Sequence, residues 1–159
     1  MKLGRLLLVR NRIGQRGKKA EAAVKKLFQE LKERHRGFDY IKLKDARSSR
    51  GKGASKQVAD FQVFTDPHHI AVEVKEINHI SRLPQKNLTQ IPKMQRRAMA
   101  GGETCILVYS LMTDSWTYAE LAWVVARKSK PSYDLSDLDW FDTAGEAWGS
   151  FCSWNNIKY

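Results

Sequence analysis

The sequence predicts an α/β or α+β fold, in which helices cover a central sheet. Apolar residues recur at helical spacing over 18–34. They are followed by segments whose residues favour strands, by a second helical segment at 91–100 and by an apolar run at 103–111. Helices and strands that alternate in this order bury their apolar faces when the helices pack on a sheet.

The first helix is expected from about Lys18 to Arg34. Its apolar side chains recur at steps of three and four residues, which places them on one face: Ala20, Val24, Leu27, Phe28 and Leu31. Gly37 is expected to end this helix, and residues 38–44 form the next predicted strand. The preceding residues, 1–15, are predicted to be an arm or short strand followed by a basic loop.

Residues 45–57 are small, basic and rich in glycine, so we expect a loop there. A β-hairpin follows. Val58–Thr65 and Ile70–Lys75 are rich in β-branched and aromatic residues, and an Asp-Pro pair between them marks a turn. Four of the six residues in Ile70–Lys75 are apolar, which favours a central strand over an exposed one.

The register of this hairpin follows from its turn. A two-residue tip at Pro67-His68 sets Gln62 opposite Glu73 and Asp60 opposite Lys75. Side chains alternate between faces along a strand, and opposed residues share a face. Asp60, Glu73 and Lys75 are therefore predicted on the same face, whereas a three-residue loop would send Asp60 to the other one.

Further elements are predicted before the C-terminal tail. Residues 78–86 form a loop, and a helix with a proline in its first turn runs over 91–100. An apolar strand at 103–111 and a short strand at 116–118 come next, whereas the pattern at 119–127 is ambiguous.

No repeat or linker divides the sequence, so residues 1–159 are predicted to form a single domain with its core at about 10–127. The tail at about 133–159 is acidic and aromatic, and core packing is favoured for it over a dimer contact. No apolar run approaches the ~20 residues that span a bilayer. Cys105 and Cys152 lack metal-ligand spacing. We therefore expect an intracellular protein with buried thiols.

Charge is distributed unevenly along the chain. The net charge is +11, with +12 in residues 1–60 and −1 in residues 61–159. A basic half favours a polyanionic partner, and nucleic acid is the first candidate. A basic surface that serves only solubility is the alternative.

The hairpin is the candidate site. Two carboxylates and a lysine that converge on an apolar hairpin suit a divalent cation with oxygen ligands, beside a group that handles a proton. The alternative is a cross-strand ion pair between Asp60 and Lys75 on a solvated face. The apolar surroundings favour the first interpretation, because a buried carboxylate normally needs a cation.

Glu21 is a fourth candidate. It lies near the start of the first predicted helix, shortly after Arg16-Gly17. A carboxylate at that position also complements the helix dipole, which is a sufficient structural reason for it. Periodicity alone therefore leaves a catalytic and a structural interpretation of Glu21 open.

These residues resemble the PD-(D/E)XK nuclease superfamily. The chain is similar in particular to Holliday junction resolvases of the archaeal Hjc and bacterial RecU types. The spacing of 13 residues from Asp60 to the Glu73-Val74-Lys75 element is similar to that in both groups, and Arg16-Gly17 followed four residues later by Glu21 resembles the Hjc opening. RecU-like features are Leu83-Pro84, Asn87, and Met94-Gln95 before Gly101-Gly102. The resemblance covers about residues 10–112.

The sequence also departs from the family pattern. Ala59 stands where a proline is expected before Asp60. Both Gln90 and Gln95 are candidates for the family's glutamine, and Gln95 fits the predicted helix better. The long stalk of RecU-type enzymes is replaced at most by the basic loop at 45–57.

The resemblance implies a restriction-endonuclease-like fold, with a mixed central sheet flanked by helices, and a Mg²⁺ site in which Mn²⁺ is able to substitute. The implied metal ligands are Asp60, Glu73, the Val74 carbonyl and, directly or through water, Glu21. Lys75 would position or deprotonate the attacking water, and Gln95 would support Lys75 or the phosphate. The implied catalytic residues are thus Glu21, Asp60, Glu73, Lys75 and Gln95.

Basic segments near these residues are predicted to contact a phosphate backbone, which positions a duplex without reading its sequence. The candidate DNA-binding residues are Arg10, Arg12, Arg16, Lys18, Lys19, Arg47, Ser48, Ser49, Arg50, Lys52 and Lys56. Either Ser48 or Ser49 resembles a loop serine of Hjc-type enzymes. An exposed loop without a ligand is the alternative for any one of these side chains.

The resemblance implies a metal-dependent, structure-selective DNA endonuclease that resolves four-way Holliday junctions in recombination. A two-fold homodimer would match the symmetry of a junction. The rivals are another nuclease of the superfamily, of restriction or repair type, and a DNA-binding module without activity. We expect a cytoplasmic location, in the host cell if the source is viral.

Overall fold

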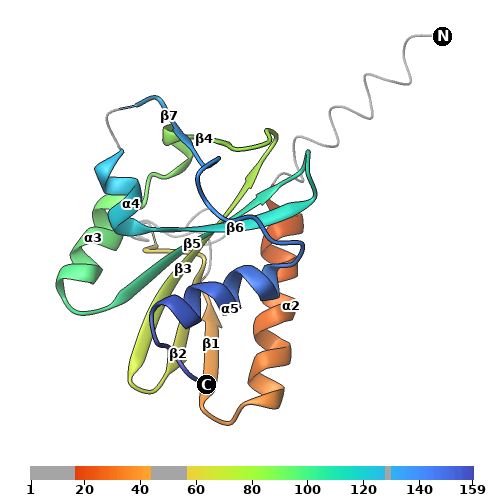
Figure 1. Cartoon of the computed structure of the whole chain (residues 1–159). Coiled ribbons are helices and arrows are strands. Elements are labelled where there is room, and N and C mark those ends of the chain that lie inside the picture. The colour runs from red at the N-terminus through yellow and green to blue at the C-terminus, as the bar shows by residue number, and fades with distance from the viewer. Residues whose placement is uncertain (1–16, 44–56, 128–129) are drawn as a thin grey trace, which may run out of the picture.

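The computed structural model describes residues 17–43, 57–127 and 130–159. Its centre is a five-stranded sheet with the strand order β1-β2-β3-β5-β6 (Figure 1). These strands span, in the same order, Phe38–Lys42, Phe61–Thr65, His68–Ile77, Glu103–Ser110 and Ser115–Glu120. β3 and β5 run parallel and the other neighbours antiparallel, so the sheet is mixed. Helices cover it on both faces, which confirms the predicted fold class of a mixed sheet flanked by helices.

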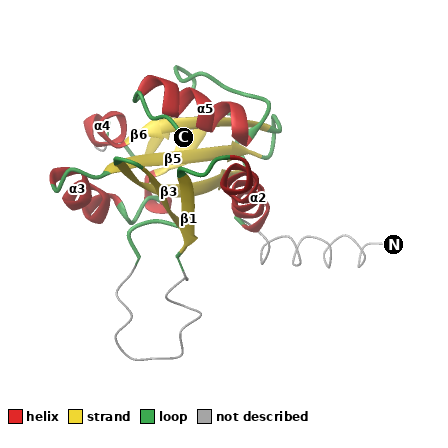
Figure 2. Ribbon diagram, turned by 90° about the horizontal axis from the view of Figure 1, so that it is seen from below, coloured by secondary structure: helices red, strands yellow, loops and turns green. Residues whose placement is uncertain are grey.

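Two apolar clusters, one on each face, hold the layers together. α2 (Lys18–Arg34) and α5 (Ala144–Trp154) cover one face, and α3 (Ile91–Met99) and α4 (Leu121–Ala126) the other (Figure 2). Their buried side chains belong to the cluster on the same face. β3 contributes to both clusters, with Val72 and Val74 on the α2 side and Ile77 on the α3 side. This alternation puts Glu73 and Lys75 on the α3 side, as expected for a strand buried on both faces.

The first helix, α2, spans Lys18–Arg34, as the sequence predicts. Its buried residues Ala20, Val24 and Phe28 are members of the predicted apolar stripe. β1 follows at Phe38–Lys42 and ends earlier than the predicted strand at 38–44, although Leu43 still donates a backbone hydrogen bond to the Asp60 carbonyl. Residues 44–56, which include the last predicted strand residue and most of the predicted loop at 45–57, lie outside the described residues.

The hairpin consists of β2, Phe61–Thr65, and β3, His68–Ile77. Its tip is Asp66-Pro67, so the predicted tip at Pro67-His68 is wrong. His68 instead pairs with Thr65 and extends β3, where the carboxylate of Glu103 holds its ring at 2.5 Å. The sequence could not show this contact, because Glu103 belongs to a distant strand.

The predicted register is therefore wrong by two residues. Gln62 lies opposite Ala71 rather than Glu73, and the paired ladder ends at Phe61 opposite Val72. A shift of two residues preserves the face of every side chain, because the side-chain period of a strand is two. Asp60 consequently keeps the face that it shares with Glu73.

The second half of the sheet comprises β5, Glu103–Ser110, and β6, Ser115–Glu120. The connection from β3 to β5 contains β4 at Arg82–Pro84, a short 3₁₀ helix η1 at Gln85–Asn87, and α3 at Ile91–Met99. The loop predicted at 78–86 thus includes a short strand, because β4 pairs with β7 at Ser132–Asp134.

The ambiguous segment at 119–127 divides between two elements. Its first residues complete β6, and α4 spans Leu121–Ala126. No helix among the described residues has the length and apolarity that a membrane crossing requires.

The C-terminal tail packs on the core through α5, Ala144–Trp154. A capping box starts this helix: the Thr143 hydroxyl accepts from the Glu146 amide at 3.1 Å, and the Glu146 carboxylate accepts from the Thr143 amide at 3.0 Å. Trp148 is fully buried, with its ring centroid 5.0 Å from that of Phe28. The core packing favoured for the tail is confirmed.

We expect Trp148→Ala to lower the free energy of unfolding by about 3–5 kcal/mol, because it removes a buried aromatic ring and leaves a cavity. Urea denaturation followed by circular dichroism measures this change. Trp154→Ala on the same helix is the matched control, since Trp154 is 72% exposed. Equal losses from the two substitutions would contradict the role of Trp148 in the core.

Candidate active site

Asp60 lies directly before β2 and is held by both neighbouring strands. Its amide donates to the Val72 carbonyl at 3.1 Å, and its carbonyl accepts from the Leu43 amide at 2.9 Å. Its carboxylate oxygen Oδ2 accepts a hydrogen bond from the Val74 amide at 2.7 Å. The carboxylate thus bonds to β3 just beyond the last paired residues of the hairpin, which fixes it beside Glu73.

Glu73 lies in the middle of the central strand and is fully buried. One carboxylate oxygen, Oε1, forms an ion pair with Nζ of Lys75, two residues along the strand. The other, Oε2, has no hydrogen-bond partner in the described part of the chain. A buried carboxylate with an unsatisfied oxygen is costly, so the solvated-face alternative does not describe Glu73.

Burial raises the proton affinity of both carboxylates, and the charge of Asp60 raises that of Glu73 further. Burial, followed by the charge of Asp60, raises the pKa of Glu73 to about 7, although Lys75 acts in the opposite direction. Burial also raises the pKa of Asp60, against the effects of the Val74 amide and of Lys75. The pKa of both acids stays raised although Lys75 lies beside them, so this buried pair is short of positive charge.

Glu21 lies at the margin of this cluster. Its carboxylate pairs with Nζ of Lys42 on β1 at 2.9 Å, rather than with the hairpin. It is nevertheless close enough that its charge raises the pKa of both Asp60 and Glu73. The structure therefore joins Asp60, Glu73 and Lys75 directly, and Glu21 through its charge.

The donor set fits a hard divalent cation. Asp60 and Glu73 offer carboxylate oxygens, and Glu73 Oε2 is buried without a partner among the described residues. In the described ranges, no three His, Cys, Asp or Glu side chains are gathered closely enough to hold a metal by themselves. Mg²⁺ does not require such a cage, since it is commonly held by one or two carboxylates together with waters and substrate phosphates.

In the described ranges, no hydrogen bond connects the candidate glutamines to this cluster. Gln95 is half-buried in α3, and no hydrogen bond joins it to Asp60, Glu73 or Lys75 within the described residues. Gln90 precedes α3 and accepts from the Thr89 hydroxyl at 3.2 Å. The role of Gln95 and the choice between the two glutamines stay predictions.

Two residues near the site have no role in the sequence-based interpretation. Gln62 alternates with the core residue Phe61 and so shares the face of Asp60; it is 7% exposed, and its Nε2 has no partner in the described part of the chain. Lys42 is the direct partner of Glu21. A glutamine inside an otherwise apolar strand is a weak sequence signal for Gln62. Nothing in the sequence indicates that Lys42 pairs with Glu21.

Of the candidate DNA-binding residues, the structure describes Lys18 and Lys19, both exposed on α2. Nζ of Lys19 donates to the Tyr109 hydroxyl at 2.9 Å and lies 3.9 Å from the Asp114 carboxylate. The remaining candidates lie outside the described residues: Arg10, Arg12, Arg16, Arg47, Ser48, Ser49, Arg50, Lys52 and Lys56.

No protein-family model matches this sequence, and a search of curated proteins finds no match either. Among solved structures, the chain is similar to the Holliday junction resolvase Hjc of the archaeal hyperthermophile Archaeoglobus fulgidus. The sequence identity is 16%, the TM-score is 0.43, and the match covers 65% of this chain and 74% of that chain.

Proposed function

We propose that this chain is a metal-dependent endonuclease that hydrolyses phosphodiester bonds in DNA. The observation that carries the proposal is the buried Glu73, adjacent to Asp60 and ion-paired with Lys75. The net charge of +11 supports a polyanionic substrate. The resemblance of these residues to the PD-(D/E)XK pattern supports the reaction class.

Asp60 and Glu73 would hold Mg²⁺, or Mn²⁺ in its place, with the Val74 carbonyl and Glu21 as further candidate ligands. When bound, such an ion supplies an activated water and stabilises charge that develops on phosphate oxygens. The Val74 amide keeps the Asp60 carboxylate oriented. Nζ of Lys75 is held by Glu73 in the same cluster, where it can donate to a phosphate oxygen or position the attacking water.

The preferred substrate in this proposal is a four-way DNA junction, resolved during recombination or repair. The order of the site residues, from Glu21 through Asp60 to Glu73-Val74-Lys75, supports this choice, because it resembles Hjc- and RecU-type resolvases. A homodimer with two active sites would cut two symmetric strands. The proposed location is the cytoplasm, or that of the host cell for a viral source.

Purified protein incubated with a labelled four-way junction and with a linear duplex of matched sequence tests both levels of the proposal. Cleavage of the junction with Mg²⁺, and none with EDTA, is the expected result. Equal cleavage of both substrates would reject junction resolution but keep the nuclease. Binding without cleavage of either substrate would reject the nuclease in favour of a DNA-binding module.

Junction binding is expected to weaken steeply with salt, because each neutralised phosphate releases a counterion. A protein that neutralises about six phosphates loses roughly a thousand-fold in affinity between about 50 and 200 mM salt. Fluorescence anisotropy with a labelled junction in EDTA measures the slope. An affinity that hardly changes over this range would rule out a phosphate-dominated interface.

A further inference from the structure

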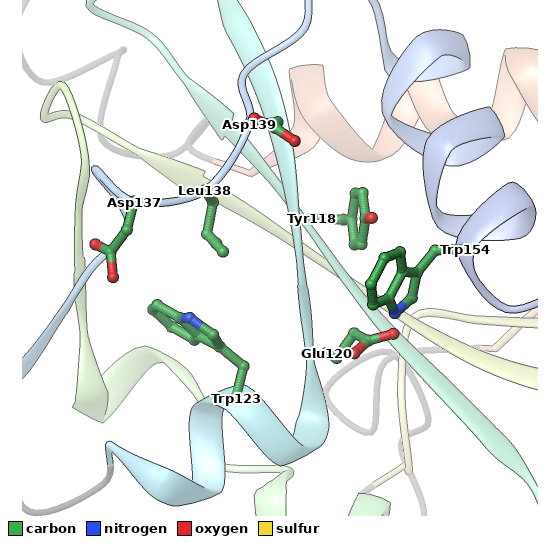
Figure 3. Close-up of a pocket in the computed structure, with 7 residues that line it drawn as sticks. All are labelled: Tyr118, Glu120, Trp123, Asp137, Leu138, Asp139 and Trp154. Carbon is green, nitrogen blue, oxygen red and sulfur yellow. The ribbon is translucent and has the colours of Figure 1, made fainter.

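A pocket lies beside β6, the edge strand of the sheet opposite to β1. It has a volume of about 240 Å³, and its walls come from β6, α4, the segment 137–139 and the end of α5 (Figure 3). β6 is separated from β3 by β5, so this pocket is distinct from the cluster of Asp60 and Glu73. Its volume is below the ~300 Å³ of sites for drug-sized molecules and suits a single long side chain.

Aromatic rings form much of the pocket wall. Tyr118 is held in place by Phe141 and Phe151, whose ring centroids lie 6.5 and 5.7 Å away. The ring of Trp123 packs beside that of Tyr133, with 6.4 Å between the ring centroids, in the apolar cluster on the α3 side of the sheet. Trp154, in contrast, leaves 72% of its surface in water. The rings of Tyr118 and Trp123 are fixed by packing, whereas the exposed ring of Trp154 offers apolar surface that a ligand in the pocket would cover.

The pocket is also acidic. Its lining residues include three carboxylates, Glu120, Asp137 and Asp139, and no lysine or arginine from the part of the chain that the structure describes. Glu120 is oriented by Asn155, whose Nδ2 donates to it at 3.1 Å. This surface therefore has the opposite sign to the whole chain, which carries +11. Such charge favours a cationic occupant and disfavours a phosphate backbone.

Beside the pocket, an arginine of this chain is already held by an aromatic ring and a carboxylate. The guanidinium of Arg127 lies 4.3 Å from the ring centroid of Trp123, and its NH2 nitrogen is 3.6 Å from the Asp137 carboxylate. A ring face and a carboxylate together stabilise a guanidinium through cation–π and ionic attraction. Trp154, Tyr118 and Glu120, which line the same pocket and have no contact with Arg127 among the interactions of the described residues, offer the same combination.

We infer that this pocket binds an arginine or lysine side chain on an exposed, apolar-flanked peptide segment of a partner protein. The aromatic rings would cover the aliphatic part of the side chain, and the carboxylates would pair with its charged end. The pocket would thereby recruit a basic partner at a surface separate from the proposed DNA site.

The test uses the full-length protein labelled with ¹⁵N and the peptide acetyl-Leu-Arg-Leu-Arg-Leu-amide. Saturable shifts of the indole N–H signals of Trp154 and Trp123 are expected, with a dissociation constant near or below ~1 mM. The same peptide with citrulline in place of arginine, which removes the charge at nearly constant shape, is expected to leave both signals unchanged.

Two variants locate the binding. Trp154→Ala and Glu120→Gln should each weaken arginine-peptide binding by about five-fold or more, as a lost cation–π or ionic contact implies. Glu120→Gln preserves the shape of the side chain and serves if the tryptophan variant does not fold. Met99→Ala, at an 88% exposed apolar residue of α3, is the control and should bind normally.

Equal shifts with the arginine and citrulline peptides would overturn the inference, because the pocket would then recognise only apolar groups. Absence of shifts at about 5 mM peptide, well above the expected constant, would also overturn it. So would concentration-dependent dimerisation that Trp154→Ala abolishes, since a second copy would then occupy the pocket. Unchanged junction cleavage by Trp154→Ala would support a surface independent of the nuclease site.

Discussion

Glu73→Gln is expected to lower Mg²⁺-dependent cleavage about a thousand-fold, which corresponds to ~4 kcal/mol of activation free energy. The glutamine keeps the size of the side chain but removes the negative charge from the buried centre of the cluster. Junction binding in EDTA should stay largely intact, because phosphate contacts and not Glu73 provide the affinity. Single-turnover cleavage and anisotropy titrations on the same junction measure the two effects.

Asp60→Asn should give the same pattern, since its carboxylate is the second acid of the pair. Glu76→Gln is the matched control. Glu76 lies three residues after Glu73 on the same strand, and its side chain accepts from the Ala20 amide of α2 at 3.4 Å. Cleavage by Glu73→Gln at the wild-type rate would rule out this cluster as the catalytic centre.

The second large effect concerns stability in the absence of divalent cations. The pKa of Glu73 rises from 4.5 to about 7 on folding, so the folded state binds its proton more tightly than the unfolded state. Below pH 4.5, Glu73 is protonated in both states and does not lower the free energy of unfolding. As the pH rises toward 7, ionisation of Glu73 lowers the free energy of unfolding by a growing amount. The shift corresponds to about 3 kcal/mol at neutral pH and above. Asp60, whose pKa is also raised, acts in the same direction.

We accordingly expect Glu73→Gln to be more stable than wild type at pH 8, and the difference to shrink or disappear near pH 4.5. Urea denaturation of both proteins in EDTA at several pH values measures it. Adding Mg²⁺ at pH 8 should stabilise wild type more than the variant, because a ligand of the folded state shifts the equilibrium. Parallel pH profiles for the two proteins would contradict an uncompensated buried carboxylate.

Much of the site was predictable from the sequence because successive side chains of a strand alternate between the two faces of the sheet. Any register of even shift places Asp60, Glu73 and Lys75 on one face, so an error of two residues at the turn did no harm. The central position of β3 was visible in its apolar run, which buries both faces. The bounds of α2 followed in the same way from its periodic apolar stripe.

Other features depended on contacts between segments far apart in the chain. The hairpin tip lies at Asp66-Pro67 because Glu103 of β5 holds His68 in the strand. The sequence predicted an ion pair of Asp60 with Lys75 as the alternative to a metal site, whereas Lys75 pairs with Glu73. Position within one strand cannot show which of two nearby carboxylates a flexible lysine reaches.

The sequence by itself determined the two main helices and most strands of the central sheet, the shared face of the three polar side chains and the basic character of the chain, since periodicity and charge are properties of neighbouring residues. Only the tertiary structure decided that Glu73 is fully buried, that Glu21 pairs with Lys42, and that α5 closes the core. Burial and pairing arise when distant segments pack together and exclude water, and this exclusion sets the free energy of each charge.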